Sequence, residues 1–391
     1  MHRIATLNAI SGVIYEALKP SHYEISENAE NPDAILVRSA DCRKRELNEN
    51  LLAIARAGAG TNNIPIDRCT EAGVVVFNTP GANANAVKEL ALCCMLMASR
   101  NVIEGVGWTK TLSGDDIAVR VEQGKSQFSG HELAGKTLGV IGLGAIGVMV
   151  ANAAYAIGMR VIGYDPFISI EHAWGLSRAI NRANSLEEML PVCEYVTIHV
   201  PLMDKTRNYI SEHVLSCMKP GTMLLNLARG ELVDNEALIS AVESGILSRY
   251  VTDFPTEALL NRENIICVPH LGATTPESEE NCARMAAEAL EEYIRLGNIH
   301  NSVNMPECNL APAGCFRICV MHKNSANMVG RITAIIGSAD CNIANMINKS
   351  RGELAYTILD LDHEPAEEMI EKIAGISGVL RVRTMQTANG R

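Results

Sequence analysis

Apolar residues along the chain follow two alternating spacings. Short, mostly apolar runs of four or five residues predict buried strands, at 34–38, 53–56, 74–77, 137–141, 160–164, 195–199, 223–226 and 265–268. Apolar residues that recur every three or four positions predict helices, at 84–100, 148–157, 235–244 and 276–296. Because strands alternate with helices, the pattern predicts an α/β protein with parallel sheets.

A different order of elements follows residue 303. The segment 303–314 contains Pro306 and Pro312 and predicts a linker. Beyond it, strands are expected at 316–321, 343–349, 355–361 and 379–384, and helices at 328–338 and 365–374. This βαββαβ order predicts a small open sandwich at the end of the chain.

The composition narrows the class of protein. A chain of 391 residues suggests two to three domains at about 150 residues each. The net charge of −11 argues against nucleic acid or an anionic membrane as a partner. No apolar run approaches a membrane span, and the first ten residues lack the pattern of a signal peptide. The twelve cysteines form no C-x-x-C pair. We therefore expect a cytoplasmic protein with reduced thiols and no metal site.

One glycine-rich turn lies between a predicted strand and a predicted helix: Gly142-Leu-Gly-Ala-Ile-Gly147. In a dinucleotide-binding turn the first glycine makes the turn, the second admits the pyrophosphate and the third lets helix and strand pack closely. Asp165 ends the next strand, where its carboxylate would accept hydrogen bonds from the adenosine ribose and repel a 2′-phosphate. Alternatively, Asp165 only caps its strand before Pro166. The motif predicts NAD as the cofactor, bound by Gly142, Gly144, Ala145, Ile146, Gly147 and Asp165.

Three polar residues, Arg229, Glu257 and His270, stand where strands are expected to end. Ligands of open α/β sheets bind beyond these carboxyl ends. Oxidation of a 2-hydroxy acid needs a base for the hydroxyl proton, and histidine is suited to that role near neutral pH. A carboxylate would fix the imidazole tautomer, and a guanidinium can hold a carboxylate at two points. We therefore predict His270 as acid/base, Glu257 as its partner and Arg229 as the substrate clamp.

Residues 34–300 resemble the D-isomer-specific 2-hydroxyacid dehydrogenases. The matching stretches are 56–60, 78–83, 133–138, 142–147, 199–202, 226–230 and 269–272. The resemblance implies two Rossmann-like, doubly wound parallel-sheet domains. Residues 1–100 and 275–302 would bind the substrate, 101–274 would bind NAD, and 303–314 would lead to a separate domain at 315–391. The active site would lie in the cleft between the first two, which closes on the substrate.

The same resemblance implies further cofactor contacts, from Val200, Leu227, Ala228, Arg229, His270 and Gly272. Asp253 would hold the nicotinamide carboxamide. Here the sequence departs from the family pattern Asp-Val-Phe-x-x-Glu-Pro. It has Asp253-Phe-Pro-Thr-Glu257-Ala, which is one residue short and lacks the final proline.

Basic residues decide which hydroxy acid is expected. Arg38 and Arg56 end predicted strands beside the loop Gly58-Ala59-Gly60, whose N–H groups suit a carboxylate. In phosphoglycerate-oxidising members of the family, matching arginines help to hold the substrate. Lys88 stands where a small residue is commoner, and is either a solvated helix lysine or a further cation directed at the cleft. These charges favour a phosphorylated substrate. Together with them, the resemblance implies oxidation of 3-phosphoglycerate to 3-phosphohydroxypyruvate, the first step of L-serine biosynthesis.

Residues 315–391 resemble an ACT domain, a βαββαβ module that binds amino acids at paired interfaces. The resemblance implies L-serine as an effector, bound by His322, Asn324 and Asn342, although Ala326 replaces a usual proline. A purely structural dimerisation unit is the alternative. Either role implies a homodimer or homotetramer.

Two other functions stay open. One is an NAD-dependent dehydrogenase of another D-2-hydroxy acid, such as glycerate. The other is a non-catalytic NAD-sensing binding protein of the same fold. The presence of Arg229, Glu257 and His270 together argues against the second, because binding alone does not need them.

Overall fold

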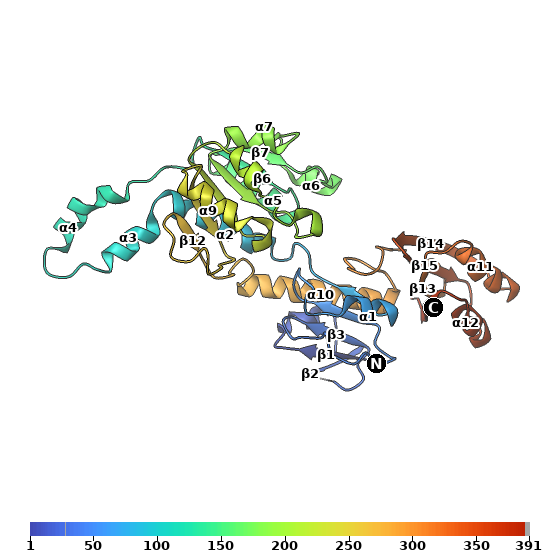
Figure 1. Cartoon of the computed structure of the whole chain (residues 1–391). Helices are drawn as coiled ribbons and strands as arrows, with labels where there is room; N and C mark the ends of the chain where they lie inside the picture. Colours follow the sequence, from blue (N-terminus) through green and yellow to red (C-terminus); the bar gives the residue numbers. More distant parts are fainter. Residues whose placement is uncertain (28, 388–391) are drawn as a thin grey trace. The chain divides into compact units, whose positions relative to one another are not determined.

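The computed structural model describes residues 1–27 and 29–387, so the last four residues of the predicted C-terminal domain lie outside the described residues (Figure 1). The chain forms two compact units: Met1–Ala82 with Glu279–Arg391, and Asn83–Ser278. We call them the first and the second unit. The predicted fold class is confirmed, since the described residues form two parallel sheets and one antiparallel sheet.

The first unit contains a five-stranded parallel sheet in the order β2-β1-β3-β4-β5. Its strands are β1 (His2–Leu7), β2 (Tyr23–Glu27), β3 (Ala34–Val37), β4 (Ala53–Arg56) and β5 (Val75–Phe77). The helices that accompany this sheet are η1 (Gly12–Glu16), α1 (Ile66–Glu71) and α10 (Pro276–Leu296), the last of which enters this unit at Glu279. Buried apolar residues of α10, among them Ala286 and Leu290, pack on the face of the sheet that carries Leu36 and Val75.

The second unit contains a seven-stranded parallel sheet in the order β12-β11-β10-β9-β6-β7-β8. The strands are β6 (Thr137–Ile141), β7 (Arg160–Tyr164), β8 (Asn181–Arg182), β9 (Tyr195–Ile198), β10 (Thr222–Asn226), β11 (Leu247–Thr252) and β12 (Ile265–Cys267). The strand order reverses between β6 and β9. In open α/β sheets, this reversal opens a crevice for a ligand at the carboxyl edge.

Helices cover both faces of the second sheet. On one face, α2 (Ala84–Ser99) and α5 (Ala145–Ala156) share a core with β6 and β7. The other face is covered by α7 (Leu186–Met189), η3 (Leu190–Val192), α8 (Glu212–Ser216) and α9 (Asn235–Glu243). The remaining short helices are α6 (Ile170–Gly175), η4 (Asp204–Thr206) and η5 (Gly230–Leu232).

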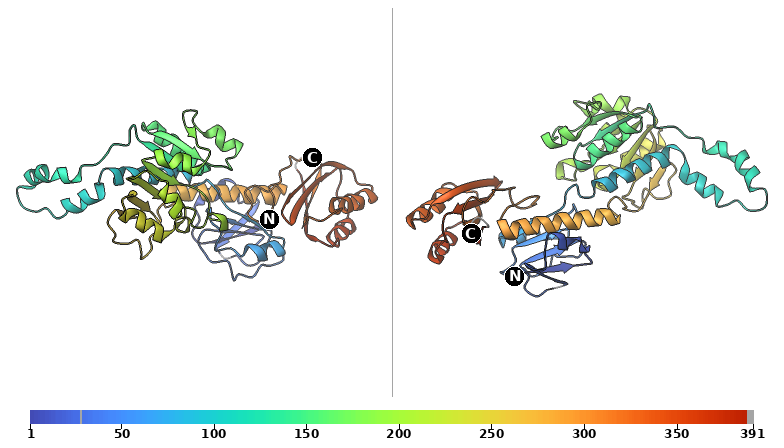
Figure 2. Two further views of the ribbon diagram at one scale, coloured as in Figure 1. Left: turned by 45° about the horizontal axis from the view of Figure 1, so that its top comes forward. Right: turned by 180° about the vertical axis from the view of Figure 1, so that it is seen from behind.

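A helical arm projects from the second unit. It consists of α3 (Val102–Thr109), α4 (Ile117–Gly124) and η2 (Lys125–Phe128), drawn in cyan (Figures 1 and 2). No residue of these three helices is buried. The base of the arm is held where the Asn101 side chain donates to the carbonyl of Ser129. Gly130 is required there, because a Cβ would lie 2.2 Å from the carbonyl oxygen of Ser99.

The C-terminal module has the predicted βαββαβ order. It consists of β13 (Phe316–Lys323), α11 (Met328–Ser338), β14 (Ile343–Arg351), β15 (Leu354–Leu361), α12 (Glu367–Ala374) and β16 (Val379–Gln386). The sheet is antiparallel, in the order β14-β15-β13-β16. Both helices cover one face, where Ile318, Ile332 and Ile373 share a core.

The other face of this module packs within the first unit. Cys319, Met321 and Tyr356 belong to the same buried cluster as α10 and the five-stranded sheet. The Arg383 guanidinium donates to the carbonyls of Tyr293 (3.1 Å) and Ile294 (2.9 Å) in the last turn of α10. These contacts make the C-terminal module part of the first unit.

Arg317 on β13 is fully buried at this junction. It forms a two-pronged ion pair with Asp360, with distances of 2.6 and 3.0 Å, and both side chains are 0% exposed. The same guanidinium donates to the carbonyls of Leu296 (2.6 Å) and Leu310 (2.9 Å). One side chain therefore connects the C-terminal sheet to the end of α10 and to the segment that follows it.

The structure moves two of the predicted boundaries. Residues 84–99 were assigned to the substrate domain, but Val87, Ala91 and Met95 of α2 belong to the core of the second unit. Residues 303–314 were predicted to be a linker because of their prolines. Instead, the Asn304 side chain accepts from the N–H of Val76 and donates to the carbonyl of Val74, while Met305 and Cys308 are buried. Apolar anchors and the edge of β5 fix this segment, so the expected separate third domain is not a separate compact unit.

Within the described part of the chain, no single helix has both the length and the apolar composition to cross a membrane. The pair α2 and α3 meets that test of length and composition only when taken together, with a bend of 66° between them.

Candidate active site

The glycine turn joins β6 to α5, as predicted. Gly142 has φ +91°, and a Cβ there would lie 2.7 Å from the carbonyl oxygen of His199. A Cβ on Gly147 would lie 1.9 Å from the carbonyl oxygen of Gly142, so only glycine permits this packing of helix on strand. A Cβ on Gly144 would meet nothing within 4 Å. The first and third glycines are therefore required by the fold, whereas the second leaves open space at the N-terminus of α5, as a pyrophosphate requires.

Asp165 lies just after β7, at the same edge. Its Oδ2 accepts from the N–H of Leu143 in the glycine turn, and its Oδ1 accepts from the N–H of Phe167, both at 2.8 Å. The predicted capping role of Asp165 is thus present. Since each carboxylate oxygen has two lone pairs, both oxygens can still accept from a ribose hydroxyl.

The backbone expected to line the cofactor also lies at this edge. Ala145 and Ile146 open α5, and Val200 follows β9, with its side chain close to Gly142. Leu227 and Ala228 follow β10, and Leu227 is buried. These positions surround the point at which the strand order reverses.

Two residues that support this edge were not predicted. Asn226 is fully buried; its amide donates to the carbonyl of Arg229 (2.8 Å) and accepts from the N–H of Ala228 (3.2 Å), which shapes the loop that carries Arg229. His199 lies 3.0 Å from the Thr197 hydroxyl, and burial lowers the pKa of His199 to about 4. His199 is therefore neutral at physiological pH. A polar residue at the end of an otherwise apolar strand was the available signal for both.

Asp253 is the centre of a charged group beyond β10, β11 and β12. It is 1% exposed, and neither carboxylate oxygen has a hydrogen-bond partner of ordinary geometry among the described residues. Burial raises the pKa of Asp253, while His270, the N–H of Gly272 and Arg229 act in the opposite direction. The structure thus brings together Arg229, Asp253, His270 and Gly272. A buried carboxylate without a partner needs a donor, and an amide N–H₂ group would supply one.

The structure does not bring Glu257 to His270. No ion pair or hydrogen bond joins them among the described residues, and both side chains are exposed. The His270 ring packs instead against Phe254, with ring centroids 4.6 Å apart. The turn after β11 is one residue shorter than the family pattern, which is the physical reason to expect a different course for the chain at Glu257.

Asp253→Asn is expected to stabilise the ligand-free protein by about 1–3 kcal/mol at neutral pH, because it removes a buried charge without a partner. An acid whose pKa is raised by folding destabilises the folded state above that pKa. The stabilisation by Asp253→Asn should therefore shrink as the pH falls through the pKa of Asp253 in the folded protein. Urea unfolding at neutral and acidic pH measures this, with the exposed Asp115→Asn as a control. Equal stability of Asp253→Asn and wild type at neutral pH would contradict the expectation.

The predicted substrate residues of the first unit lie at the carboxyl edge of its sheet. Arg38 follows β3 and Arg56 ends β4; the Arg56 Nε donates to the carbonyl of Arg38 (2.9 Å). The loop Gly58-Ala59-Gly60 is held by Asn78, whose amide donates to the carbonyl of Ala59 (2.6 Å), and by the N–H of Thr79, which donates to the carbonyl of Gly58 (3.2 Å). Arg38, Arg56 and the loop are therefore brought together.

Lys88 belongs to α2 in the second unit. Its Nζ donates to Asn85 (2.5 Å) and lies 3.8 Å from a carboxylate oxygen of Glu89, and the side chain is 20% exposed. These contacts hold Lys88 on its own helix, and the choice between its two predicted roles stays a prediction.

The predicted effector residues belong to the C-terminal module. His322 is buried, with Nδ1 2.9 Å from the carbonyl of Lys323 and Nε2 2.8 Å from the Thr357 hydroxyl. Asn324 and Asn342 are exposed. An effector could reach the two asparagines directly, but would reach His322 only by displacing one of its present partners.

All twelve cysteines carry free thiols, and most are buried. Among the described residues, Cys341, Asp362 and His363 place three possible metal-ligand atoms within 4.8 Å of one another. Asp362 and His363 are about half exposed, and such groups are common on protein surfaces without an ion. None of the predicted active-site residues belongs to this group.

Comparison with known proteins gives the family. Residues 92–272 match the D-isomer specific 2-hydroxyacid dehydrogenase, NAD binding domain. The D-3-phosphoglycerate dehydrogenase of Haemophilus influenzae is 31% identical over 389 residues, which cover 95% of this chain and 88% of that protein. This chain belongs to the D-isomer-specific 2-hydroxyacid dehydrogenases. The predicted resemblance is thereby confirmed.

Other members of the family extend the comparison. The D-3-phosphoglycerate dehydrogenase of Methanocaldococcus jannaschii is 34% identical over 86% of this chain, which spans 63% of that protein's length. A crystal structure of NAD⁺-bound 3-phosphoglycerate dehydrogenase from Entamoeba histolytica has a TM-score of 0.60 and 28% identity, and covers 78% of this chain and 98% of that chain. NAD is therefore the cofactor of the second unit. The space at Gly144 and the unpartnered Asp253 carboxylate fit it.

Proposed function

We propose that the protein is an NAD-dependent dehydrogenase that oxidises 3-phosphoglycerate to 3-phosphohydroxypyruvate, the first step of L-serine biosynthesis. One observation carries the proposal: Arg229, Asp253 and His270 meet beyond the carboxyl ends of strands in the NAD-binding sheet. Oxidation of a 2-hydroxy acid by NAD requires a base for the hydroxyl proton, a guanidinium for the substrate carboxylate and an acceptor for the nicotinamide carboxamide. The curated relatives named D-3-phosphoglycerate dehydrogenase support this substrate.

Each group has a proposed role. Gly142, Gly144, Gly147 and Asp165 bind the dinucleotide, with Ala145, Ile146, Val200, Leu227, Ala228 and Gly272 along its path, and Asp253 accepts from the carboxamide. NAD, when bound, accepts the hydride from C2 of the substrate. His270 takes the hydroxyl proton, and Arg229 holds the substrate carboxylate at two points.

Glu257 keeps a proposed role as the partner of His270. In ligand-free proteins, catalytic hydrogen bonds are often long and shorten only when the substrate binds. The exposed turn 254–257 has no buried side chain that would prevent such a rearrangement.

The substrate phosphate would be bound by the first unit. Arg38 and Arg56 supply two guanidinium groups beside the N–H groups of Gly58, Ala59 and Gly60. Lys88 is a further proposed cation, which would have to leave Asn85 to reach a ligand.

A substrate panel tests the proposal. With NAD and alkaline pH, NADH absorbance should appear with 3-phosphoglycerate at a kcat/KM at least tenfold above that with D-glycerate. Comparable kcat/KM values for the two acids would favour the alternative, an NAD-dependent dehydrogenase of another D-2-hydroxy acid. If no acid is oxidised but NADH still binds, the protein is a cofactor-sensing binding protein instead.

We further propose that L-serine regulates the enzyme through an ACT-type C-terminal module. The βαββαβ order and the exposed Asn324 and Asn342 support this role. Equilibrium dialysis with millimolar L-serine tests it, with Asn342→Ala as the variant expected to bind less. Absence of binding to the wild type would leave the module a structural role.

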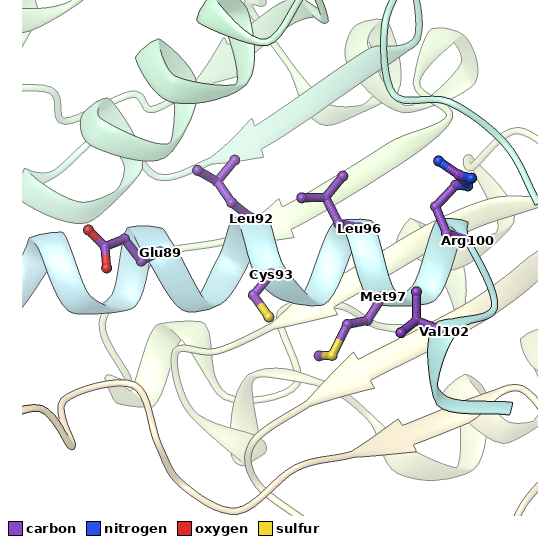
Figure 3. A pocket seen from close by; sticks show the side chains of 7 residues that line it. All are labelled: Glu89, Leu92, Cys93, Leu96, Met97, Arg100 and Val102. Carbon is purple, nitrogen blue, oxygen red and sulfur yellow. The ribbon is translucent and has the colours of Figure 1, made fainter. Parts of the chain in front are cut away.

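The proposed assembly is a homodimer or homotetramer in which two copies associate through the arm of the second unit. Val102, Val106 and Val119 of the arm are 44–57% exposed. Beside the arm, α2 bears an open hollow of about 610 Å³, lined by Glu89, Leu92, Cys93, Leu96, Met97, Arg100 and Val102 (Figure 3). A second copy could cover this hollow with its own arm and receive the first arm in return, as a two-fold interface requires.

Val106→Glu should therefore turn the dimer into a monomer, because it places a charge in the apolar contact. Analytical ultracentrifugation measures the change. Trp174→Glu alters a side chain that is 81% exposed on α6, away from the arm, and should leave the dimer intact. A wild type that sediments as a monomer would rule this interface out.

The proposed compartment is the cytoplasm. Twelve free thiols suit a reducing environment, in which unpaired cysteines persist.

A further inference from the structure

Arg38 and Glu279 form an ion pair at the carboxyl edge of the first sheet. Arg38 comes directly after β3, and Glu279 lies in the first turn of α10, 241 positions further along the chain. The Arg38 Nη2 and the Glu279 Oε1 are 2.5 Å apart. Both side chains keep contact with water, at 42% and 39% exposure. The Glu279 carboxylate thus pairs with the Arg38 guanidinium, which is proposed to bind the substrate.

The backbone around Arg38 is fixed more firmly than its side chain. The Arg38 carbonyl accepts from Arg56 Nε at 2.9 Å. The next two N–H groups, of Ser39 and Ala40, donate to Asn8 Oδ1 at 3.0 and 2.8 Å. Asn8 itself has φ +81°, a conformation that asparagine tolerates better than most residues. A change of partner at Arg38 therefore involves the guanidinium and leaves the backbone in place.

A guanidinium binds a carboxylate and a phosphate in the same two-pronged way, so the two anions compete for it. An exposed ion pair contributes little to stability and exchanges readily. When a phosphate approaches Arg38, it must displace the Glu279 carboxylate and is then repelled by that nearby charge.

We propose that Glu279 determines specificity by competing with the substrate phosphate for Arg38, which limits affinity for phosphorylated acids. This inference rests on the proposed function, which makes Arg38 a substrate residue. A solely structural role for Glu279 is the alternative, because an acid in the first turn of a helix is stabilised by the helix dipole. Glu280 provides the matched control: it lies in the same turn and is exposed, and no ion pair of Glu280 is present among the described residues.

The experiment compares Glu279→Gln and Glu280→Gln with wild type at saturating NAD. For Glu279→Gln, KM for 3-phosphoglycerate should fall about three- to tenfold, the range expected when one exposed charge is removed beside a bound anion. KM for D-glycerate and both kcat values should change less than about twofold, because glycerate has no phosphate. Glu280→Gln should behave as wild type.

An unchanged or higher KM for 3-phosphoglycerate, or an equal change for both acids, would overturn the proposal. Titration with inorganic phosphate tests it without turnover, and so separates its failure from failure of the proposed function. Glu279→Gln should bind phosphate about three- to tenfold more tightly than wild type, and this gain should vanish when Arg38→Met is also present. Equal phosphate affinity in wild type and Glu279→Gln overturns the inference even if 3-phosphoglycerate is not a substrate.

Discussion

Replacing His270 by alanine is expected to lower kcat for substrate oxidation by a factor of about 10²–10⁴, because a positioned acid/base contributes that much. His270 lies beside Asp253 in the second unit and packs against Phe254. NADH absorbance under saturating substrate measures the loss. Binding of NADH, followed by fluorescence, should change far less than kcat.

The matched variant is Glu257→Gln. If Glu257 orients His270 once the substrate binds, this variant should lose a substantial part of kcat, although less than His270→Ala. A Glu257→Gln enzyme with wild-type kcat would remove Glu257 from the mechanism and leave His270 beside Asp253 and Phe254, as the structure has it. A His270→Ala enzyme that keeps more than a tenth of wild-type kcat would contradict the assignment of the base.

Asp360→Asn should destabilise the first unit by about 3–5 kcal/mol, since it leaves the buried Arg317 guanidinium without its counter-charge. Both side chains are fully buried, and the Asp360 Oδ2 also accepts from the N–H of Ala313 (2.9 Å). Equilibrium unfolding in urea, followed by circular dichroism, measures the change in the free energy of unfolding.

Arg43 and Asp41 supply the control for this second prediction. They form an Arg–Asp pair at 2.7 Å, but the side chains are 64% and 52% exposed. Asp41→Asn should leave the free energy of unfolding unchanged within error, because exposed pairs are screened by water. If Asp360→Asn and Asp41→Asn change the free energy of unfolding equally, burial does not make the Arg317–Asp360 pair more important for stability than an exposed pair.

Much of the fold could be predicted from apolar spacing. The helix predicted at 276–296 has those bounds as α10, and the six elements of the C-terminal module lie within a few residues of their predicted positions. These segments have a clear period and clear ends. By contrast, β1, β2, β8 and β11 were missed. β1 begins with two polar residues, and β11 contains Ser248 and Arg249. The apolar runs in these two strands are therefore too short to predict a strand.

Domain boundaries were harder, because they depend on which surfaces meet. Nothing in the spacing of α2 reveals whether it packs on the first or the second sheet. Similarly, Pro306 and Pro312 are typical of a linker, yet Asn304 is bonded to β5, Met305 is buried, and Cys308 lies against Tyr356 of the C-terminal module. Partners far apart in sequence determined both outcomes.

In the candidate site, too, some residues were predictable from the local sequence and others depended on partners far apart in the chain. Gly142, Gly144 and Gly147 were predictable from the motif and its place between a strand and a helix; Gly142 and Gly147 have a local steric reason, whereas Gly144 leaves open space for the ligand. The grouping of Arg229 and His270 followed from strand ends that share one edge, whereas Asp253 was expected there only from the family resemblance. The pairing of Glu257 with His270 depended on the course of one short turn, which sequence spacing does not determine. Glu279 went unnoticed, because its relation to Arg38 arises only when α10 packs on the first sheet.

The docking of the C-terminal module has a consequence for protein engineering. A truncated enzyme that ends before residue 315 would lack Arg317 and Arg383, which cap the last carbonyls of α10. It would also uncover Cys308, which now lies against Tyr356. Such a fragment should be prone to aggregation, so loss of activity on truncation would not demonstrate allosteric control. Chimeras that exchange this module between relatives will need matching α10 ends as well, because the module packs on the last turn of α10 and not only on the segment with the prolines.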